Sequence, residues 1–262
     1  MLVYLDIICP KRGLKNRFME IFRRKKPLVF KKSMDNISYL EIYFPKVRKS
    51  VLKKMFFATV DKKAALVASK NFPTKLFEGQ NFITEPREIK ARLLINFLKK
   101  ALKEAENNRK LNILLIDKNA AAVAAAAELI PLCNVFVATD RFDLYGPCAE
   151  YCFLKYGDRP KKADRLCGIS AAVAPFGTNG LILPNSSTPV LSPNSPEGFS
   201  LTKEDFCFFH PELFPENAPK ELFLEGIFKN FCPSEILEKC PESLVFQGIS
   251  ANADFFSKKF FN

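Results

Sequence analysis

In the first third of the chain, segments with the hydrophobic pattern of strands are interleaved with segments that have the pattern of helices. Residues 2–8 are a short apolar run and residues 37–44 are rich in β-forming side chains, which predicts two strands, and 64–68 is expected to form another. Residues 12–25 and 46–57 place apolar side chains at helical spacing with basic residues on the other face. Together these patterns predict a small α/β region.

A long amphipathic helix follows an irregular connector at residues 71–85. Thr84 begins the helical pattern, Pro86 lies near its first turn, and Asn107-Asn108 closes it. A continuous apolar stripe runs down one side of this segment. We expect the helix to bridge the first region and the part that follows.

Residues 110–182 alternate strand and helix at the period of a Rossmann-like βαβ unit. The expected strands are 112–118, 134–140 and 169–175, and the expected helices lie within 119–130 and 141–157. Strands that alternate with helices in this way lie adjacent and parallel in one sheet. The expected fold class is therefore α/β, a Rossmann-like parallel sheet domain preceded by a smaller basic α/β region.

The composition changes after Gly180. Residues 184–200 are rich in Pro, Ser and Asn and predict a long loop, whereas 218–230 and 233–239 predict helices. The aromatic tail, 254–262, is expected to dock on the body of the protein. The expected regions are thus 1–83 (basic α/β), 84–183 (Rossmann-like, with the bridging helix) and 184–262 (loop and helical C-terminal segment).

Charge is distributed unevenly along the chain, whose net charge is +12. Residues 1–110 hold 27 Lys and Arg against 10 Asp and Glu, and the remainder holds 13 against 18. A basic half can face nucleic acid, anionic lipid or an acidic partner, although a solvated lysine-rich surface is the plainer interpretation. Because no nucleic-acid-binding motif accompanies it, we expect at most weak polyanion binding by the basic N-terminal half.

Eight cysteines and one histidine, His210, make up the potential soft metal ligands. No CxxC pair occurs, and only Cys148 and Cys152 are close enough in sequence to share a helix face, so we expect free thiols and no metal site. The sequence shows no signal peptide and no apolar run of about 20 residues. These features favour a cytoplasmic protein without a membrane span.

The stretch after residues 112–116 departs from the dinucleotide-binding fingerprint G-x-G-x-x-G. Asp117, Asn119 and Ala122 take the places of the three glycines. Asn119 tolerates a left-handed backbone and could keep the turn. Asp117 either faces a ligand, where it would repel a pyrophosphate, or caps the next helix. Because of that like charge, we expect no binding of NAD or NADP in the usual dehydrogenase manner.

Further candidate ligand-binding residues follow the other two strands. Asp140 lies 23 residues after Asp117, near the place of the ribose-binding acid in dinucleotide folds, although Asp140-Arg141 also fits a helix cap with an exposed partner. The ligand-binding candidates are Asp117, Asn119, Thr139, Asp140, Arg141 and Gly177. Tyr145 and His210 have no partner in the pattern, and no catalytic residue or cofactor is identified.

The order of a smaller basic region, a long bridging helix and this domain resembles the two-domain shikimate dehydrogenase type. The likeness is one of pattern over about residues 84–182, and it implies a Rossmann-like fold. The glycine fingerprint is absent and no catalytic Lys-Asp pair is matched, so the likeness favours the fold over the activity.

Two functions remain open from the sequence. One is a protein that binds a small molecule or nucleotide at the carboxyl ends of its strands. The alternative is a non-enzymatic interaction or regulatory protein on a dehydrogenase-like scaffold, and fold alone does not separate the two. A nucleic-acid binder ranks third.

Overall fold

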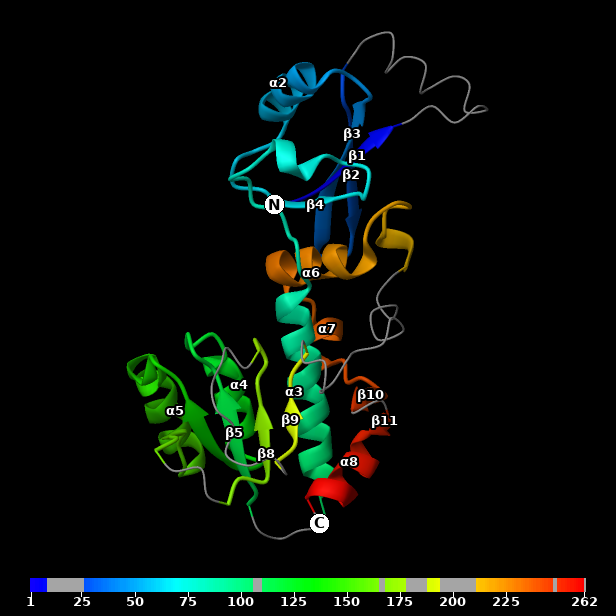
Figure 1. The fold of residues 1–262 in the computed structure, drawn as a ribbon. Helices are drawn as coiled ribbons and strands as arrows, with labels where there is room; N and C mark the ends of the chain where they lie inside the picture. The colour runs from blue at the N-terminus through cyan, green and yellow to red at the C-terminus, as the bar shows by residue number, and fades with distance from the viewer. Residues whose placement is uncertain are drawn as a thin grey trace. The chain divides into compact units, whose positions relative to one another are not determined.

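The computed structural model describes residues 1–8, 26–105, 110–164, 168–177, 188–193, 211–246 and 249–261 (Figure 1). The helix expected at 12–25 and His210 lie outside these ranges. Contacts divide the chain into two compact units. Unit 1 comprises Met1–Ile89 and Phe206–Leu237, and unit 2 comprises Lys90–Asp205 and Glu238–Asn262. The expected third region, 184–262, is therefore shared between the two units.

Unit 1 is built on a four-stranded sheet in the order β2-β3-β1-β4. The strands are β1 (Leu2–Ile8), β2 (Leu28–Met34), β3 (Ile37–Pro45) and β4 (Ala65–Ala68). β1 runs parallel to β3 and β4, whereas β2 runs antiparallel to β3. The sequence did not predict β2 because its side chains are mostly exposed and lack an apolar face. A two-residue turn joins β2 to β3, and Asp35 adopts a φ of 51° there.

The two faces of this sheet pack on different helices. One face meets α2 (Lys49–Thr59) and η1 (Thr74–Leu76) in a core that contains Val3, Leu5, Ile42, Phe44, Leu52, Phe56, Phe72 and Phe77. On the other face, Phe223 of α6 (Lys220–Phe231) makes edge contacts with Tyr4 and Tyr39. Gly226 brings α6 close to the sheet, since a Cβ there would lie 2.6 Å from Cδ1 of Leu2.

Unit 2 contains a five-stranded sheet in the order β7-β6-β5-β8-β9. The strands are β5 (Asn112–Ile116), β6 (Asn134–Ala138), β7 (Lys161–Lys162), β8 (Ala171–Val173) and β9 (Val190–Leu191), and every neighbouring pair is parallel. In chain order this is 3-2-1-4-5, the strand order of the doubly wound dinucleotide-binding fold. The predicted Rossmann-like class and the parallel placement of the three predicted strands are confirmed. The long loop expected over 184–200 is wrong at Val190–Leu191, which pair with β8.

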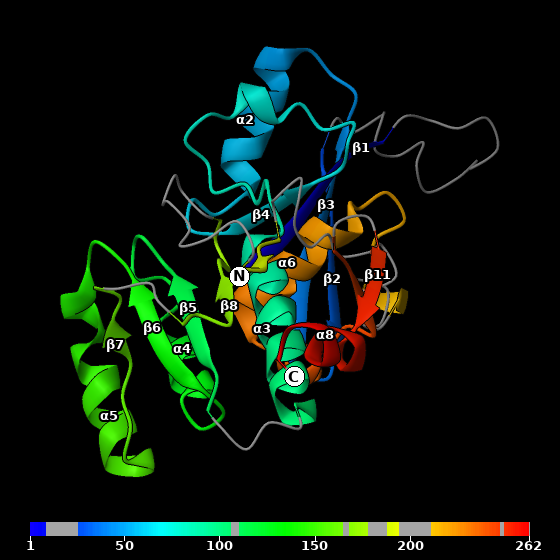
Figure 2. The same cartoon turned by 60° about the horizontal axis from the view of Figure 1, so that its bottom comes forward.

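Helices α3 (Arg87–Glu104), α4 (Val123–Leu129), α5 (Gly146–Tyr156) and α8 (Ala253–Phe260) contribute to the main core of unit 2. α5 contacts α4, and Figure 2 shows it beside β7 at the margin of this unit. The predicted end of α5 is confirmed, because Gly157 adopts the left-handed conformation at its C-cap. The aromatic tail docks as expected, since the ring of Phe256 lies 6.0 Å from that of Phe97.

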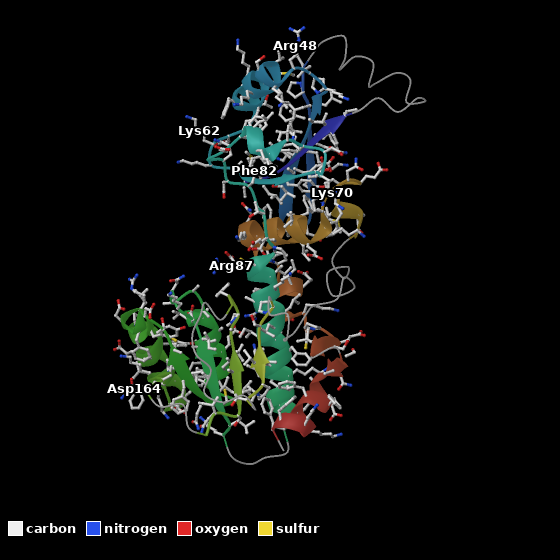
Figure 3. All side chains as sticks on the ribbon, in the orientation of Figure 1. Arg48, Lys62, Lys70, Phe82, Arg87 and Asp164 are labelled. Atoms are coloured by element: carbon white, nitrogen blue, oxygen red, sulfur yellow. The ribbon has the colours of Figure 1, made fainter. Side chains whose placement is uncertain are left out.

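The remaining described elements are η2 (Phe142–Tyr145), η4 (Pro211–Leu213), α7 (Ser234–Glu238) and the antiparallel pair β10 (Ser243–Phe246) and β11 (Ile249–Asn252). Basic side chains surround α2 in unit 1, and Figure 3 shows Arg48 and Lys62 projecting outward there. In the part of the chain that the structure describes, no helix is long and apolar enough to cross a bilayer.

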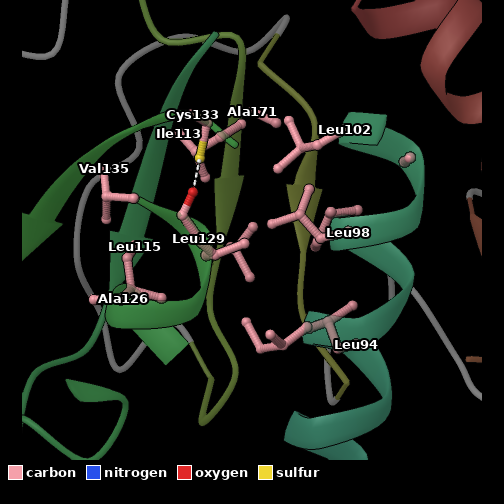
Figure 4. Close-up of a cluster of buried hydrophobic side chains, with 14 of the residues drawn as sticks. Leu94, Leu98, Leu102, Ile113, Leu115, Ala126, Leu129, Cys133, Val135 and Ala171 are labelled. Carbon is pink, nitrogen blue, oxygen red and sulfur yellow. Dashed lines mark hydrogen bonds between the residues drawn. The ribbon is translucent and has the colours of Figure 1, made fainter. Parts of the chain in front are cut away.

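The core of unit 2 forms where α3 and α4 cover one face of the sheet. Figure 4 shows Leu94, Leu98 and Leu102 of α3 facing a cluster that includes Ile113 and Leu115 of β5. The thiol of Cys133 lies in this core and donates to the carbonyl of Leu129 at 3.4 Å. The face of the sheet that α3 and α4 cover is therefore packed against one continuous hydrophobic core.

Candidate functional site

The candidate site is the carboxyl edge of the unit 2 sheet, where β6, β5 and β8 end side by side. Ile116 pairs with Ala138, and Leu115 pairs with Val173, so the residues that follow these strands lie at one edge. The strand order reverses between β5 and β8, which is where ligands bind in open α/β sheets. The structure thus brings Asp117, Thr139 and Gly177 to the same edge.

Asp117 is buried at this edge, with 3% of its surface exposed. Its Oδ1 accepts the N–H of Ala121 at 2.8 Å, and its Oδ2 accepts the N–H of Ala122 at 2.7 Å. Since α4 begins at Val123, these are the N–H groups at the entrance to the helix, which have no acceptor within the helix. In Rossmann domains such groups receive the pyrophosphate. The protein's own carboxylate fills that position.

Tyr145 completes the hydrogen bonding of Asp117, although the sequence pattern gave it no partner. Its hydroxyl donates to Oδ2 of Asp117 at 2.6 Å, and the side chain is fully buried. Burial, followed by the Asp117 hydrogen bond and charge, raises the pKa of Tyr145 above its usual value. The hydroxyl therefore remains a donor across the physiological range, and the carboxylate of Asp117 has three donors.

In the turn between β5 and α4, the left-handed residue lies one position later than expected. Asn119 is exposed and does not take a positive φ, whereas Ala120 adopts a φ of 55°. The prediction that Asn119 supplies the left-handed residue is therefore wrong. Alanine pays a steric cost of about 1–2 kcal/mol in this conformation because its Cβ approaches the following carbonyl oxygen. The Asp117 hydrogen bonds that span the turn offset this cost.

Thr139 fixes the adjacent turn after β6. Its hydroxyl donates to the carbonyl of Lys118 at 3.2 Å and accepts the N–H of Arg141 at 3.1 Å. Arg141 pairs loosely with Asp143 at 3.8 Å, and both side chains are largely exposed. Asp140 is exposed, and its carboxylate has no hydrogen bond or ion pair within the described residues. Gly177 follows β8 with a φ of 91° and donates its N–H to the carbonyl of Ala174.

A second buried carboxylate caps the first turn of α3, whose first residues belong to unit 1. Glu225 of α6 is fully buried and accepts the N–H of Glu88 at 3.0 Å and that of Ile89 at 2.9 Å, at the start of α3. Lys229 balances its charge at 3.2 Å. Sequence reasoning missed this contact, which joins residues far apart in the chain. In both units, therefore, an internal carboxylate occupies a helix N-terminus where an external anion would otherwise bind.

The cysteines of the described residues are consistent with the expected free thiols. Cys133, Cys148, Cys152, Cys232 and Cys240 are unbridged. Cys148 and Cys152 share a face of α5, with their Sγ atoms 3.9 Å apart. Within the described ranges, no group of three or more His, Cys, Asp or Glu side chains is placed to hold a metal ion.

Comparison with known proteins finds a weak structural similarity. No protein-family model matches the chain, and no curated protein sequence matches it. Among solved structures, the chain is similar to shikimate dehydrogenase in complex with NADP+, at 13% sequence identity and a TM-score of 0.29, over 73% of this chain and 76% of that one. This is the type that the order of parts in the sequence resembles. The strand order, rather than this comparison, establishes the Rossmann-like class of unit 2.

Proposed function

We propose that this protein is a non-enzymatic interaction or regulatory protein on a dehydrogenase-like scaffold. The observation that supports the proposal is the carboxylate of Asp117, which accepts the N–H groups of Ala121 and Ala122. A dinucleotide would have to displace this carboxylate or bind beside it. Two unit charges ~4 Å apart at an effective dielectric near 20 repel by about 4 kcal/mol. That energy corresponds to about a thousandfold in affinity and turns a micromolar site into a millimolar one.

A small molecule without a pyrophosphate is the second candidate ligand at this edge. Asp140 favours it, because its exposed carboxylate is unpaired within the described part of the chain. A carboxylate in that position accepts hydrogen bonds from hydroxyl or amine groups. The ligand class that fits is therefore a neutral or cationic molecule bearing such donors, bound at the ends of β5 and β6.

The exposed face of α2 in unit 1 supports weak binding of polyanions. Lys49, Lys53 and Lys54 are exposed on this helix, which contains no acidic residue, and none of them forms an ion pair among the described residues. Replacing all three with glutamine should lower retention on heparin and flatten its salt dependence, because fewer counterions are released. Glutamine at Lys155, Lys258 and Lys259 is the matched control in unit 2. Retention that both triple variants share equally would refute a role for α2.

A thermal-shift screen tests the proposed function. NAD, NADP, mononucleotides and S-adenosylmethionine are each added to the intact protein, since a ligand that binds the native state raises the melting temperature by mass action. We expect no shift with the two dinucleotides at concentrations that saturate a micromolar site. A shift with either of them would overturn the proposal. A shift with a mononucleotide or S-adenosylmethionine alone would favour the small-molecule candidate, and an Asp140→Asn variant would then show whether Asp140 contacts it.

A further inference from the structure

Unit 2 exposes a concentrated apolar surface on and beside α5. Of the six exposed large hydrophobic side chains among its described residues, five lie between positions 144 and 156. They are Leu144, Tyr151, Phe153, Leu154 and Tyr156. Leu154 is 80% exposed and Phe153 is 58% exposed. Single exposed apolar residues are ordinary, whereas a patch of neighbouring ones marks an interaction surface.

An ordinary surface helix has one apolar side, which faces the core, whereas α5 has apolar residues on its solvent-facing side as well. Cys152 on the inner side is fully buried. Tyr151 and Leu154 lie three residues apart and therefore project from the same outer side. Both side chains are exposed, and α5 lies at the margin of unit 2 (Figures 1 and 2). A partner outside the described chain is thus needed to remove this surface from water.

Charges of opposite sign flank the apolar surface. Glu150 is exposed, and its carboxylate has no ion pair or hydrogen bond within the residues that the structure describes. Lys155 is exposed, and its Nζ donates to the hydroxyl of Tyr151 at 2.9 Å. Six consecutive residues of α5, less than two turns of helix, therefore present an acid, two large apolar side chains and a base in the order Glu150, Tyr151, Leu154, Lys155. When the same order is read in reverse on a second helix, the base faces the acid and the apolar side chains face each other.

We propose that α5 is the contact surface of a homodimer in which two copies pack their α5 helices antiparallel. A two-fold interface sets residue i opposite residue j and residue j opposite residue i. An antiparallel register that places Tyr151 against Leu154 of the second copy also places Glu150 against Lys155 of the second copy, because both pairs share one midpoint on the helix. A single register thus satisfies the apolar and the charged contacts together.

The area of the outer side limits the strength of this dimer. The exposed parts of Tyr151 and Leu154, its two large apolar side chains, amount to roughly 250 Å², given ~200 Å² for a large side chain. Two copies would bury about 500 Å² of them, well below the ~1,600 Å² of a standard specific interface. We therefore expect weak, reversible association. This inference does not depend on the Asp117 argument, and its failure would leave the dinucleotide result unchanged.

Sedimentation of the intact protein over a concentration series tests the dimer. We expect a monomer–dimer equilibrium that Leu154→Lys weakens at least ~10-fold, the effect of losing 1.4 kcal/mol of apolar contact. Phe255→Lys, which replaces the sixth exposed large hydrophobic side chain of the unit, is the matched control and should not change the equilibrium. A monomer at every concentration up to about 1 mM would overturn the proposal. A dimer that tolerates Leu154→Lys would overturn it as well.

Charge reversal tests the antiparallel register. Glu150→Lys and Lys155→Glu should each weaken self-association, because each places like charges opposite one another twice across the two-fold axis. A mixture of the two single variants should form a heterodimer, since every facing pair is then of opposite charge. The double variant should self-associate as the unmodified protein does. Single variants that associate normally, or a mixture that stays monomeric, would refute this register.

Discussion

The Asp117 hydrogen-bond network predicts an unusually large loss of stability from one substitution at a surface-facing turn. Asp117→Ala removes the acceptor of two backbone N–H groups and of the Tyr145 hydroxyl. Ala121 is exposed, so water can replace its lost partner, whereas Ala122 and Tyr145 are buried. The substitution therefore leaves two buried donors unsatisfied and destabilises the turn that contains the strained Ala120.

The expected magnitude follows from these contacts. A buried donor left without a partner costs about 1–3 kcal/mol, and loss of a helix cap costs ~1 kcal/mol. With two buried donors and one cap lost, Asp117→Ala should thus cost about 3–7 kcal/mol, which reaches or exceeds the cost of a core cavity. Asp117→Asn keeps the volume but turns an NH2 group toward a backbone donor, so it should cost ~2 kcal/mol. Asp140→Ala, at the same edge, should cost less than ~0.5 kcal/mol, because the Asp140 side chain is exposed and has no hydrogen bond or ion pair among the described residues.

Two measurements check this expectation. Urea unfolding gives the free-energy change, and hydrogen exchange at Ala121 and Ala122 localises it, because two compact units can unfold separately. A double-mutant cycle of Asp117→Ala with Tyr145→Phe should give a coupling of about 1–2 kcal/mol. An Asp117→Ala variant as stable as Asp140→Ala, with amide exchange unchanged, would refute the capping account.

Three further substitutions test separate parts of the fold. Ala120→Gly should raise the free energy of unfolding by ~0.5–1 kcal/mol in urea titrations, because glycine relieves the positive φ; a loss of stability would contradict the strain. Burial raises the pKa of Glu128, but hydrogen bonds from Arg92 and then Lys99 outweigh it and hold the pKa below its ordinary value. Because this pKa is lowered in the folded state, the ion pairs of Glu128 stabilise the fold above the ordinary pKa of a glutamate, and the effect is lost as the pH falls through the folded-state pKa. Glu128→Gln should therefore cost ~1 kcal/mol at neutral pH and nothing in acid. A cost that does not change with pH would refute the stabilising role of these ion pairs. Gly226→Ala should destabilise unit 1 by about 1–3 kcal/mol in thermal melts despite the better helix propensity of alanine, since its Cβ meets Leu2 of β1, Ile83 and Val67 of β4; a stabilised variant would show that α6 can shift.

The Rossmann-like part of the fold could be predicted because its central strands, β5 and β8, are buried on both faces. The run 113–116 is continuously apolar, and the small residues of 119–130 allow close packing on a sheet. β2 could not be predicted in the same way, because exposed side chains leave no periodic pattern. β7 and β9 are two residues long, too short for any period to be visible.

The candidate site divides along similar lines. Its edge could be predicted, since parallel strands end together and Asp117 stands in place of a fingerprint glycine. The orientation of Asp117 could not be, because it depends on Tyr145, a buried hydroxyl 28 residues away that local spacing does not connect to it. Asn119 misled for a related reason: propensity favoured it for the left-handed position, but the Asp117 hydrogen bonds place that conformation on Ala120.

The central claim is that the carboxylate of Asp117 occupies the place of a dinucleotide pyrophosphate. Titration calorimetry with NAD, NADH, NADP and NADPH tests it most directly, on the unmodified protein and on Asp117→Gly, with Asp140→Gly as the control at the same edge. We predict no binding in the micromolar range by the unmodified protein or the control, and binding, where any appears, only when Asp117 is removed. Micromolar binding of any of the four dinucleotides by the unmodified protein would contradict the claim.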